Sequence, residues 1–358
     1  MPKRFSALAA LTLGSTALIA QAPQQGNPAQ AAPAPAPFDA AEAKAAVEKL
    51  ATSLEENFVF PEVGAKYAAA LRAKLASGGY SNFPDAAAFA DAVTADLKAV
   101  HEDRHLRVRA LPPQGAGGER RMGPPPGFKA IEKAGWIADG VAYISFAGFP
   151  GDEPTLARLR SFLAEHKDAK ALIIDARGHR GGGLAEMDVM FPYFYDKPQT
   201  LVKMDTRIAV EERQGSPLDE GPTLVKEKGP DGVVRRSHNV IPASQATGLR
   251  TAKIFLLTSN RTASAAEHLS LSLKRTGRAT LIGETTRGAG HYGGGVPLGG
   301  GYGVFIPVGR TFDPDTNQGW EGSGVKPDVE VPADKALDEA LRRAGVEPAK
   351  AKTLAALN

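Results

Sequence analysis

Two histidines in one short stretch, His101 and His105, have a spacing that could hold a metal ion. The stretch reads HEDRH and fits the zinc-peptidase pattern H-E-x-x-H. A zinc site of this kind needs the motif in the middle of a helix, so that both imidazoles share one face, and a third ligand further along the chain. Here the helical pattern stops at once, and the residues that follow, LRVRALPPQG, alternate like a strand.

Neither candidate for the third zinc ligand lies in the helical sequence pattern that such a ligand needs. Glu119 lies in a glycine-rich loop, and Glu132 has no helical E-x-x-x-D pattern around it. The chain also has no cysteine, which excludes disulfides, thiolate chemistry and cysteine-ligated zinc or iron–sulfur sites. We therefore expect no metal at this stretch and no cofactor elsewhere.

A serine at a strand-to-helix turn offers a different chemistry. The apolar run KIFLLT leads into a polar turn and then into an amphipathic helix that starts near Ser264. A serine at such a turn is exposed, and the amides beside it, including that of Ala265, lie at the positive end of the helix dipole. Acyl transfer needs this arrangement, because the developing oxyanion requires preorganised donors. The alternative is an ordinary N-cap serine.

Two further features could complete such a site. The turn in LIIDARGHRGGG follows an apolar run, and Gly181 or Gly182 could supply a second oxyanion amide. Taken alone, this turn could equally bind phosphate or simply be tight. Glu267 lies three residues after Ser264, on the same helix face. It could support the site, or it could be a solvated helix carboxylate.

The hydrophobic pattern divides the chain in two. Apolar residues recur at helical spacing between residues 38 and 100, with Gly/Pro breaks that separate three helices, so we expect a small helical domain over 38–110. Over 125–345, strand-like runs alternate with helical stretches, which favours an α/β domain with a largely parallel sheet. The stretch GYGVFIPVGRTF predicts an added antiparallel hairpin strand.

The N-terminal residues have the composition of an export signal. Lys3 and Arg4 precede an apolar stretch of small residues and leucines, so residues 1–22 are interpreted as a signal peptide and 23–37 as a Pro/Ala-rich linker. We expect export to a bacterial periplasm, without stable membrane insertion after cleavage. The net charge of +3 and the lack of long Lys/Arg runs argue against a nucleic-acid partner.

Four motifs together resemble one family. DARGHRGGG resembles the D-L-R-x-N-x-G-G signature of the C-terminal processing (tail-specific) serine peptidases, and TSNRTASAAEH resembles their T-S-x-x-T-x-S-A-A-E segment. GRATLIGETTRGAG and GSGVKPDVEVP resemble two later motifs of that family, in the same order. The resemblance implies a crotonase-like (ClpP-like) α/β core and peptide or protein C-terminal tails as substrates. It also implies that Ser264 is the nucleophile and that Glu267 supports the site.

The departures from the family pattern bear on the catalytic base. Many members use a Ser–Lys dyad, but Ala289 stands in the lysine position, and residues 106–139 are too few for a PDZ domain. Both features resemble the branch that includes interphotoreceptor retinoid-binding protein and the tricorn core protease. In tricorn-like enzymes a histidine from the preceding segment is the base, and DRHLRV fits that position. The resemblance therefore implies that His105 activates Ser264. We expect His101, one helical turn earlier on the core-facing ridge, to be structural.

Alternatives remain at two levels. His268 and His291 are rival bases, because each lies near the serine or the missing lysine in the sequence. An unperturbed imidazole titrates near ~6.5, so a histidine base predicts an acid limb with an apparent pKa of roughly 6–7. At the level of function, retinoid-binding relatives carry apolar ligands, so a non-catalytic protein that binds apolar ligands or peptides is the alternative to a peptidase.

Overall fold

The computed structural model describes residues 36–111, 127–218, 220–245 and 247–358. The predicted signal peptide, most of the predicted linker and Glu119 lie outside the described residues. No helix in these ranges is long and apolar enough to cross a membrane.

The N-terminal region forms the three predicted helices: α1 (Ala40–Asn57), α2 (Pro61–Ala76) and α3 (Ala86–Val100). Asp39 begins α1 by accepting hydrogen bonds from the first free amides, and Asp85 does the same for α3. The helical spacing predicts two apolar stripes, one of Val47, Leu50, Leu54 and Phe58 and one of Phe89, Val93, Leu97 and Val100. Both face inward, because all of these residues except the half-buried Val100 are at most 1% exposed.

Helix α3 ends where the HEDRH stretch begins. His101 is the C-cap, with an extended backbone at φ −159°, and its side chain is exposed. The expectation that His101 and His105 lie one turn apart on a core-facing ridge is wrong, because the helix has already ended. After a turn, β1 (Arg107–Ala110) pairs antiparallel with β11 (Tyr302–Phe312), so the helical region shares a hydrophobic core with the remainder of the described chain.

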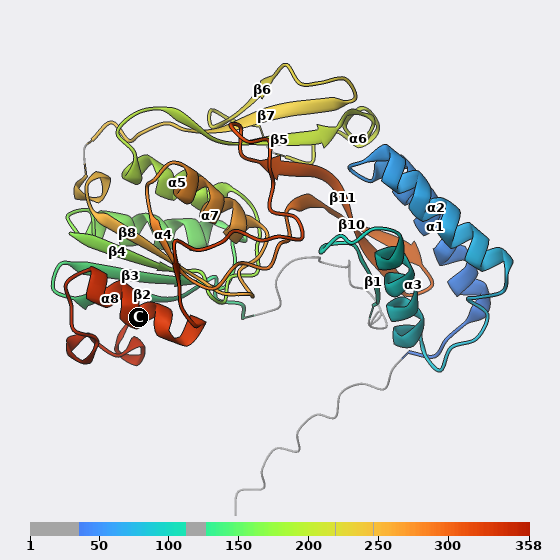
Figure 1. The fold of residues 1–358 in the computed structure, drawn as a ribbon, viewed down its shortest axis with the longest axis horizontal. Coiled ribbons are helices and arrows are strands. Elements are labelled where there is room, and N and C mark those ends of the chain that lie inside the picture. Colours follow the sequence, from blue (N-terminus) through green and yellow to red (C-terminus); the bar gives the residue numbers. More distant parts are fainter. Residues whose placement is uncertain (1–35, 112–126, 219, 246) are drawn as a thin grey trace, which may run out of the picture. The chain divides into compact units, whose positions relative to one another are not determined.

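The predicted parallel sheet lies at the centre of the α/β region (Figure 1). Its neighbouring strands are parallel except for one antiparallel edge pair. The strand order is β12 (Val329–Glu330), β9 (Thr280–Gly283), β8 (Lys253–Thr258), β4 (Ala171–Asp175), β3 (Val141–Phe146) and β2 (Ile131–Ala138).

Helices cover both faces of this sheet. Alternate residues of β4 enter different cores: Leu172 and Ile174 pack with α4, α5 and α7, whereas Ile173 packs with α8. The helices are α4 (Glu153–Glu165), α5 (Ala185–Phe194), α7 (Ala265–Arg275) and α8 (Ala336–Arg343). Short 3₁₀ turns span Gly248–Arg250, Ala333–Lys335, Pro348–Lys350 and Leu354–Ala356.

A second sheet is antiparallel throughout, and of its strands the sequence predicted only β11 and, within LRVRALPPQG, β1. The order is β1–β11–β5–β7–β6, with β10 also paired to β11. Its other elements are β5 (Gln199–Arg207), α6 (Ile208–Gln214), β6 (Leu224–Glu227), β7 (Val233–Val240) and β10 (His291–Gly299).

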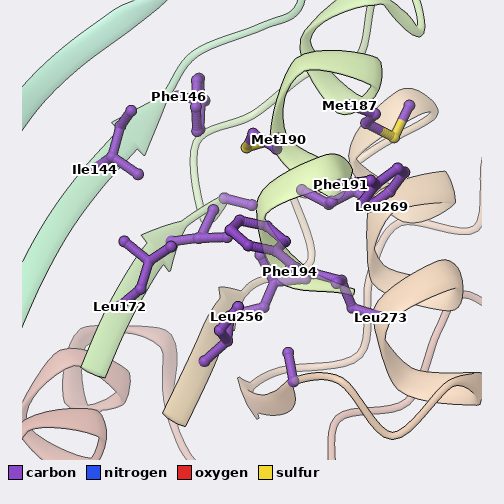
Figure 2. Close-up of a cluster of buried hydrophobic side chains, with 14 of the residues drawn as sticks. Ile144, Phe146, Leu172, Met187, Met190, Phe191, Phe194, Leu256, Leu269 and Leu273 are labelled. Atoms are coloured by element: carbon purple, nitrogen blue, oxygen red, sulfur yellow. The ribbon is translucent and has the colours of Figure 1, made fainter. Parts of the chain in front are cut away.

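Helix α7 is anchored by its apolar face. Leu269 and Leu273 point from α7 towards Phe191 and Phe194 of α5, as Figure 2 shows, and all four side chains are at most 1% exposed. Because this contact is dry and closely packed, the position of the α7 N-terminus is fixed by the core and not by solvent-exposed contacts.

Candidate active site

Ser264 is the N-cap of α7 and has an unusual backbone. Its φ of +58° and ψ of −118° lie in a region that favours glycine, and Asn317 is the only other described non-glycine residue with positive φ. Such strain persists where the surroundings fix it, often at functional sites. The helix predicted to start near Ser264 is confirmed, and Ser264 remains partly exposed at its N-terminus.

The turn before Ser264 is tied to the end of β4. The Thr262 hydroxyl accepts a hydrogen bond from the Ser259 amide (2.9 Å) and donates to the Ala176 carbonyl (2.8 Å). The Ala263 amide donates to the His179 carbonyl (3.0 Å). These bonds bring the glycine-rich turn after β4 alongside the turn that carries Ser264.

Gly181 makes the closest approach to Ser264. A Cβ atom on Gly181 would lie 2.8 Å from Ser264 Cβ and 3.3 Å from Ser264 Oγ, and Gly181 has φ +110°. Only glycine fits here. The Gly181 amide, however, donates to His179 Nδ1 (3.0 Å), whereas the Gly182 amide has no acceptor among the described residues.

Glu267 is completely buried beneath the serine and is not a solvated carboxylate. One of its oxygens, Oε2, accepts from the amides of Ser264 (2.8 Å) and Ala289 (2.9 Å). The other, Oε1, accepts from the Thr286 hydroxyl and the Gly288 amide, each at 2.6 Å. Burial raises the pKa of Glu267, while these four donors act in the opposite direction by stabilising the carboxylate.

Ala289 occupies the position where a dyad lysine would stand. Its side chain is 3% exposed, its amide bonds Glu267, and its carbonyl accepts from the indole N–H of Trp320 (3.0 Å). The next two amides, of Gly290 and His291, both donate to Glu321 Oε2, at 2.5 and 3.2 Å. Residues 289–291 therefore contribute backbone amides, which hold the carboxylates of Glu267 and Glu321.

His105 lies in a cluster of charged groups. Asp103, His105 and Glu321 each bring one potential ligand atom to within 4.8 Å of the others. The imidazole of His105 stacks on Phe305, and its Nδ1 is buried without a hydrogen-bond partner among the described residues. His291 Nδ1 donates to Asp103 Oδ2 (2.7 Å).

Burial and neighbouring charges shift the pKa values of the groups in this cluster. It lowers the pKa of His105 to about 4, although the charge of Asp103 opposes the shift. Burial also raises the pKa of Glu321, with the charge of Asp103 adding to the effect. For Asp103, the hydrogen bond and charge of His291 outweigh burial, so its pKa lies below the usual value. His105 is therefore neutral at pH 7.

The cluster is linked through Arg287 to the turn that carries Ser264. The charge of Arg287 acts on His105, and the Arg287 amide donates to the Thr262 carbonyl (2.9 Å) two residues before Ser264. No side chain in the described ranges hydrogen-bonds to Ser264 Oγ itself.

His268, one of the rival bases, is engaged elsewhere. Its Nε2 shares a 2.8 Å hydrogen bond with His238 Nδ1, and His238 Nε2 lies 3.1 Å from Asp188 Oδ1. Burial lowers the pKa of His268 well below its usual value, and the neighbouring His238 adds to this. His268 therefore belongs to a buried polar chain behind α7.

The zinc pattern H-E-x-x-H does not form a histidine pair. His101 and His105 are not on one helix, and the only described group with metal-ligand spacing joins His105 to Asp103 and Glu321. Glu132 lies on β2 and is exposed. The side chains of His105, Asp103 and Glu321 would offer a metal ion one nitrogen and two carboxylates.

Sequence reasoning missed three residues that the structure brings to the site. Glu321 stands one residue before the quoted closing motif GSGVKPDVEVP, and Asp103 stands two residues before His105. His179 stands in the asparagine position of the glycine-rich signature. Each could have been noticed as a polar residue within or directly beside a quoted motif, but no local pattern indicates its partner.

Comparison with known proteins identifies the family of this chain. Residues 140–331 match the model of Peptidase family S41, and residues 40–131 match the N-terminal domain of peptidase S41 in eukaryotic IRBP. The chain is 31% identical over 130 residues to the chloroplastic carboxyl-terminal-processing peptidase 1 of Arabidopsis thaliana, covering 36% of this chain and 26% of that protein. It is 25% identical over 194 residues to the carboxy-terminal processing protease CtpB of Bacillus subtilis, covering 53% and 34%.

A solved structure shares the fold. The photosystem II D1 C-terminal processing protease superposes with a TM-score of 0.50 at 16% identity, covering 86% of this chain and 98% of that one. The chain spans only 26% and 34% of the two curated relatives. Because the family model matches more than half of the chain, including the turn at Ser264 and the glycine-rich turn, this protein belongs to peptidase family S41.

Proposed function

We propose that this protein is an exported serine peptidase that cleaves peptides or the C-terminal tails of proteins, with Ser264 as the nucleophile. The observation that carries the proposal is the backbone of Ser264, held at φ +58° at the N-terminus of α7 with Gly181 against its Oγ. A nucleophile on such a strained strand-to-helix turn is exposed beside amides that can stabilise an oxyanion.

The proposed reaction is acyl transfer through a covalent intermediate. Ser264 Oγ attacks the carbonyl carbon of the scissile peptide bond while its proton passes to the base. The base then protonates the leaving amine, and water hydrolyses the acyl-enzyme. The amides of Gly182 and Ala265 are the proposed oxyanion donors. In this assignment Gly181, the third oxyanion candidate from the sequence, instead provides the close approach that a side chain would block.

His105 is the proposed base. It is neutral at pH 7, and its side chain makes no hydrogen bond within the described ranges, so no described partner competes for the lone pair that would accept the serine proton. His268 is a weaker candidate, because its Nε2 is committed to the buried His238. His291 remains the rival base, because its Nδ1 donates to Asp103 as a histidine base donates to the carboxylate that orients it. Glu321 and Asp103 lie close enough to His105 to stabilise the imidazolium that forms when it takes the proton.

Glu267 is proposed to support the site without touching the substrate. It fixes the Ser264 amide through the same oxygen that binds the Ala289 amide. This bond helps to hold the strained nucleophile conformation, because a carboxylate with four donors has little freedom to move.

The proposed substrate class rests on the names of relatives, and the proposed location rests on sequence composition. The two curated relatives are named as carboxyl-terminal processing proteases, and the signal-like composition of residues 1–22 supports export. Fractionation of cells that produce the full chain tests the location. Recovery in the cytoplasmic fraction, with residues 1–22 retained, would contradict export.

Labelling with a serine-reactive fluorophosphonate tests the nucleophile. We expect wild-type protein and the surface control Ser323→Ala to be labelled at Ser264, and Ser264→Ala to remain unlabelled. The two variants should also differ in peptide hydrolysis, with Ser264→Ala reduced by several orders of magnitude. An unlabelled wild type that binds apolar ligands or peptides would instead support the non-catalytic alternative.

A further inference from the structure

His179 lies in an apolar pocket directly behind the glycine-rich turn. Its side chain is fully buried. The ring makes an edge-to-face contact with Phe149 at 4.1 Å between centroids and lies 6.2 Å from Phe146. This packing leaves the imidazole little freedom to rotate, so its nitrogens have fixed directions.

Three hydrogen bonds connect His179 to both halves of the proposed site. Its amide donates to the Ala176 carbonyl (3.1 Å) at the end of β4, and its carbonyl accepts from the Ala263 amide (3.0 Å) beside the serine. Its Nδ1 accepts from the Gly181 amide (3.0 Å). One residue therefore links the nucleophile turn to the glycine-rich turn.

The hydrogen bond from Gly181 decides the tautomer of His179. Because Nδ1 accepts, the proton of the neutral ring is on Nε2. Burial lowers the pKa of His179 to about 3, so the ring stays neutral and Nδ1 stays an acceptor throughout the neutral pH range. Nε2 is buried without a hydrogen-bond partner among the described residues. A buried unpaired donor is costly, so its presence calls for an explanation.

The flanking peptides are held as well. The Gly181 carbonyl accepts from the Phe149 amide (2.9 Å), and the Gly183 amide donates to the Phe149 carbonyl (2.8 Å). With Gly181 and Gly183 both engaged, the Gly182 amide is the donor of this turn that is left for a substrate oxygen.

We propose that His179 is a positioning residue: by accepting the Gly181 amide, it holds the turn so that the Gly182 amide faces the oxyanion formed at Ser264. This role rests on the proposed function. It explains why a histidine is kept where one ring nitrogen has no partner, since the other nitrogen fixes a turn on which catalysis depends.

Two substitutions at His179 distinguish the effect of the hydrogen-bond acceptor from the effect of filling the pocket. His179→Asn keeps an acceptor, because an asparagine side chain can accept from the amide two residues on. His179→Leu fills the pocket without an acceptor. We expect His179→Leu to lower kcat roughly 10- to 100-fold with little change in KM, which is less than the ~10²–10³-fold cost of deleting an oxyanion donor. His179→Asn should recover most of that loss.

His166→Leu is the matched control. His166 is also a buried histidine with an unpartnered Nε2, and its Nδ1 bonds the Phe162 carbonyl of α4, away from the serine. It should leave kcat unchanged. In addition, ¹⁵N NMR of the Ser264→Ala protein should show His179 protonated at Nε2 and neutral down to at least about pH 5.

Three results would overturn the proposal. They are a His179→Leu enzyme with wild-type kcat, Asn and Leu variants that lose kcat equally while remaining folded, and a ¹⁵N signature of a proton on Nδ1. Failure of the proposed function would give a different result from failure of this proposal, because the fluorophosphonate would then not label the wild-type protein.

Discussion

Glu267 and Glu321 bind four consecutive backbone amides of one segment. Glu267 accepts from Gly288 and Ala289, and Glu321 accepts from Gly290 and His291. Glu267 also holds the Ser264 amide, and Glu321 lies within 4.8 Å of a ligand atom of His105. The segment that lacks the dyad lysine thus joins the nucleophile to the histidine cluster through its backbone.

Gly181→Ala should inactivate the enzyme. The new Cβ would lie 2.8 Å from Ser264 Cβ, on a residue with φ +110°, so either the serine or the glycine-rich turn must move. Because a displacement of about 1 Å can cost about 10²-fold, we expect kcat/KM to fall at least ~10²-fold in a peptide-hydrolysis assay. Gly178→Ala is the matched control, since its Cβ meets nothing within 4 Å. Equal activity of the two variants would remove Gly181 from the site.

Glu267→Gln should destabilise the fold and lower activity. An amide nitrogen cannot accept hydrogen bonds, so at least one pair of buried donors would lose its acceptor, at about 1–3 kcal/mol each. We expect a loss of about 2–6 kcal/mol in the free energy of unfolding, measured with urea, and a lower kcat at temperatures where the variant is folded. Glu212→Gln changes an exposed carboxylate on α6 and should change neither. Unchanged stability of Glu267→Gln would contradict the buried four-donor arrangement.

The pH profile should reveal a base with a depressed pKa. The proposed base must be neutral to accept the serine proton, so activity is present above its pKa and is lost as pH falls through it. Burial lowers the pKa of His105 to about 4. The acid limb of kcat/KM should therefore lie closer to 4 than to the roughly 6–7 expected for an unperturbed histidine.

Substitution identifies the residue behind that limb. His105→Ala should lose activity nearly as completely as Ser264→Ala, and the double variant should be little worse than either, because nucleophile and base act as one unit. His101→Ala alters an exposed histidine of the same stretch and should retain wild-type activity and the same acid limb. A fully active His105→Ala enzyme would move the base to His268 or His291.

Chelation should not inactivate the enzyme. The proposed chemistry uses no metal, so peptide hydrolysis should survive dialysis against EDTA or phenanthroline. Added zinc could still occupy Asp103, His105 and Glu321, and such binding would be inhibitory because it would engage the base. Loss of activity on chelation, with recovery on zinc addition, would instead restore the zinc-peptidase interpretation of HEDRH.

The sequence by itself predicted the three N-terminal helices, the parallel sheet and the turn that carries Ser264. The apolar periodicities predicted α1–α3, the parallel sheet and the β11 hairpin, because these patterns reflect which face of each element is buried. The helix start at Ser264 was readable for the same local reason: an apolar strand, a polar turn and an amphipathic helix follow one another. The four motifs, which lie in this order along the α/β region, indicated the family.

Only the tertiary structure decided which groups meet at the site. The carboxylate of Glu267 could be solvated or buried until the segment 288–291 was seen to cover it, and Glu321 joins His105 from a distant part of the chain. The pKa of His105 likewise depends on burial by residues far away in sequence. Local patterns report the conformation of neighbouring residues, whereas desolvation and pairing of charges arise when distant segments pack, and so they are set by the fold as a whole.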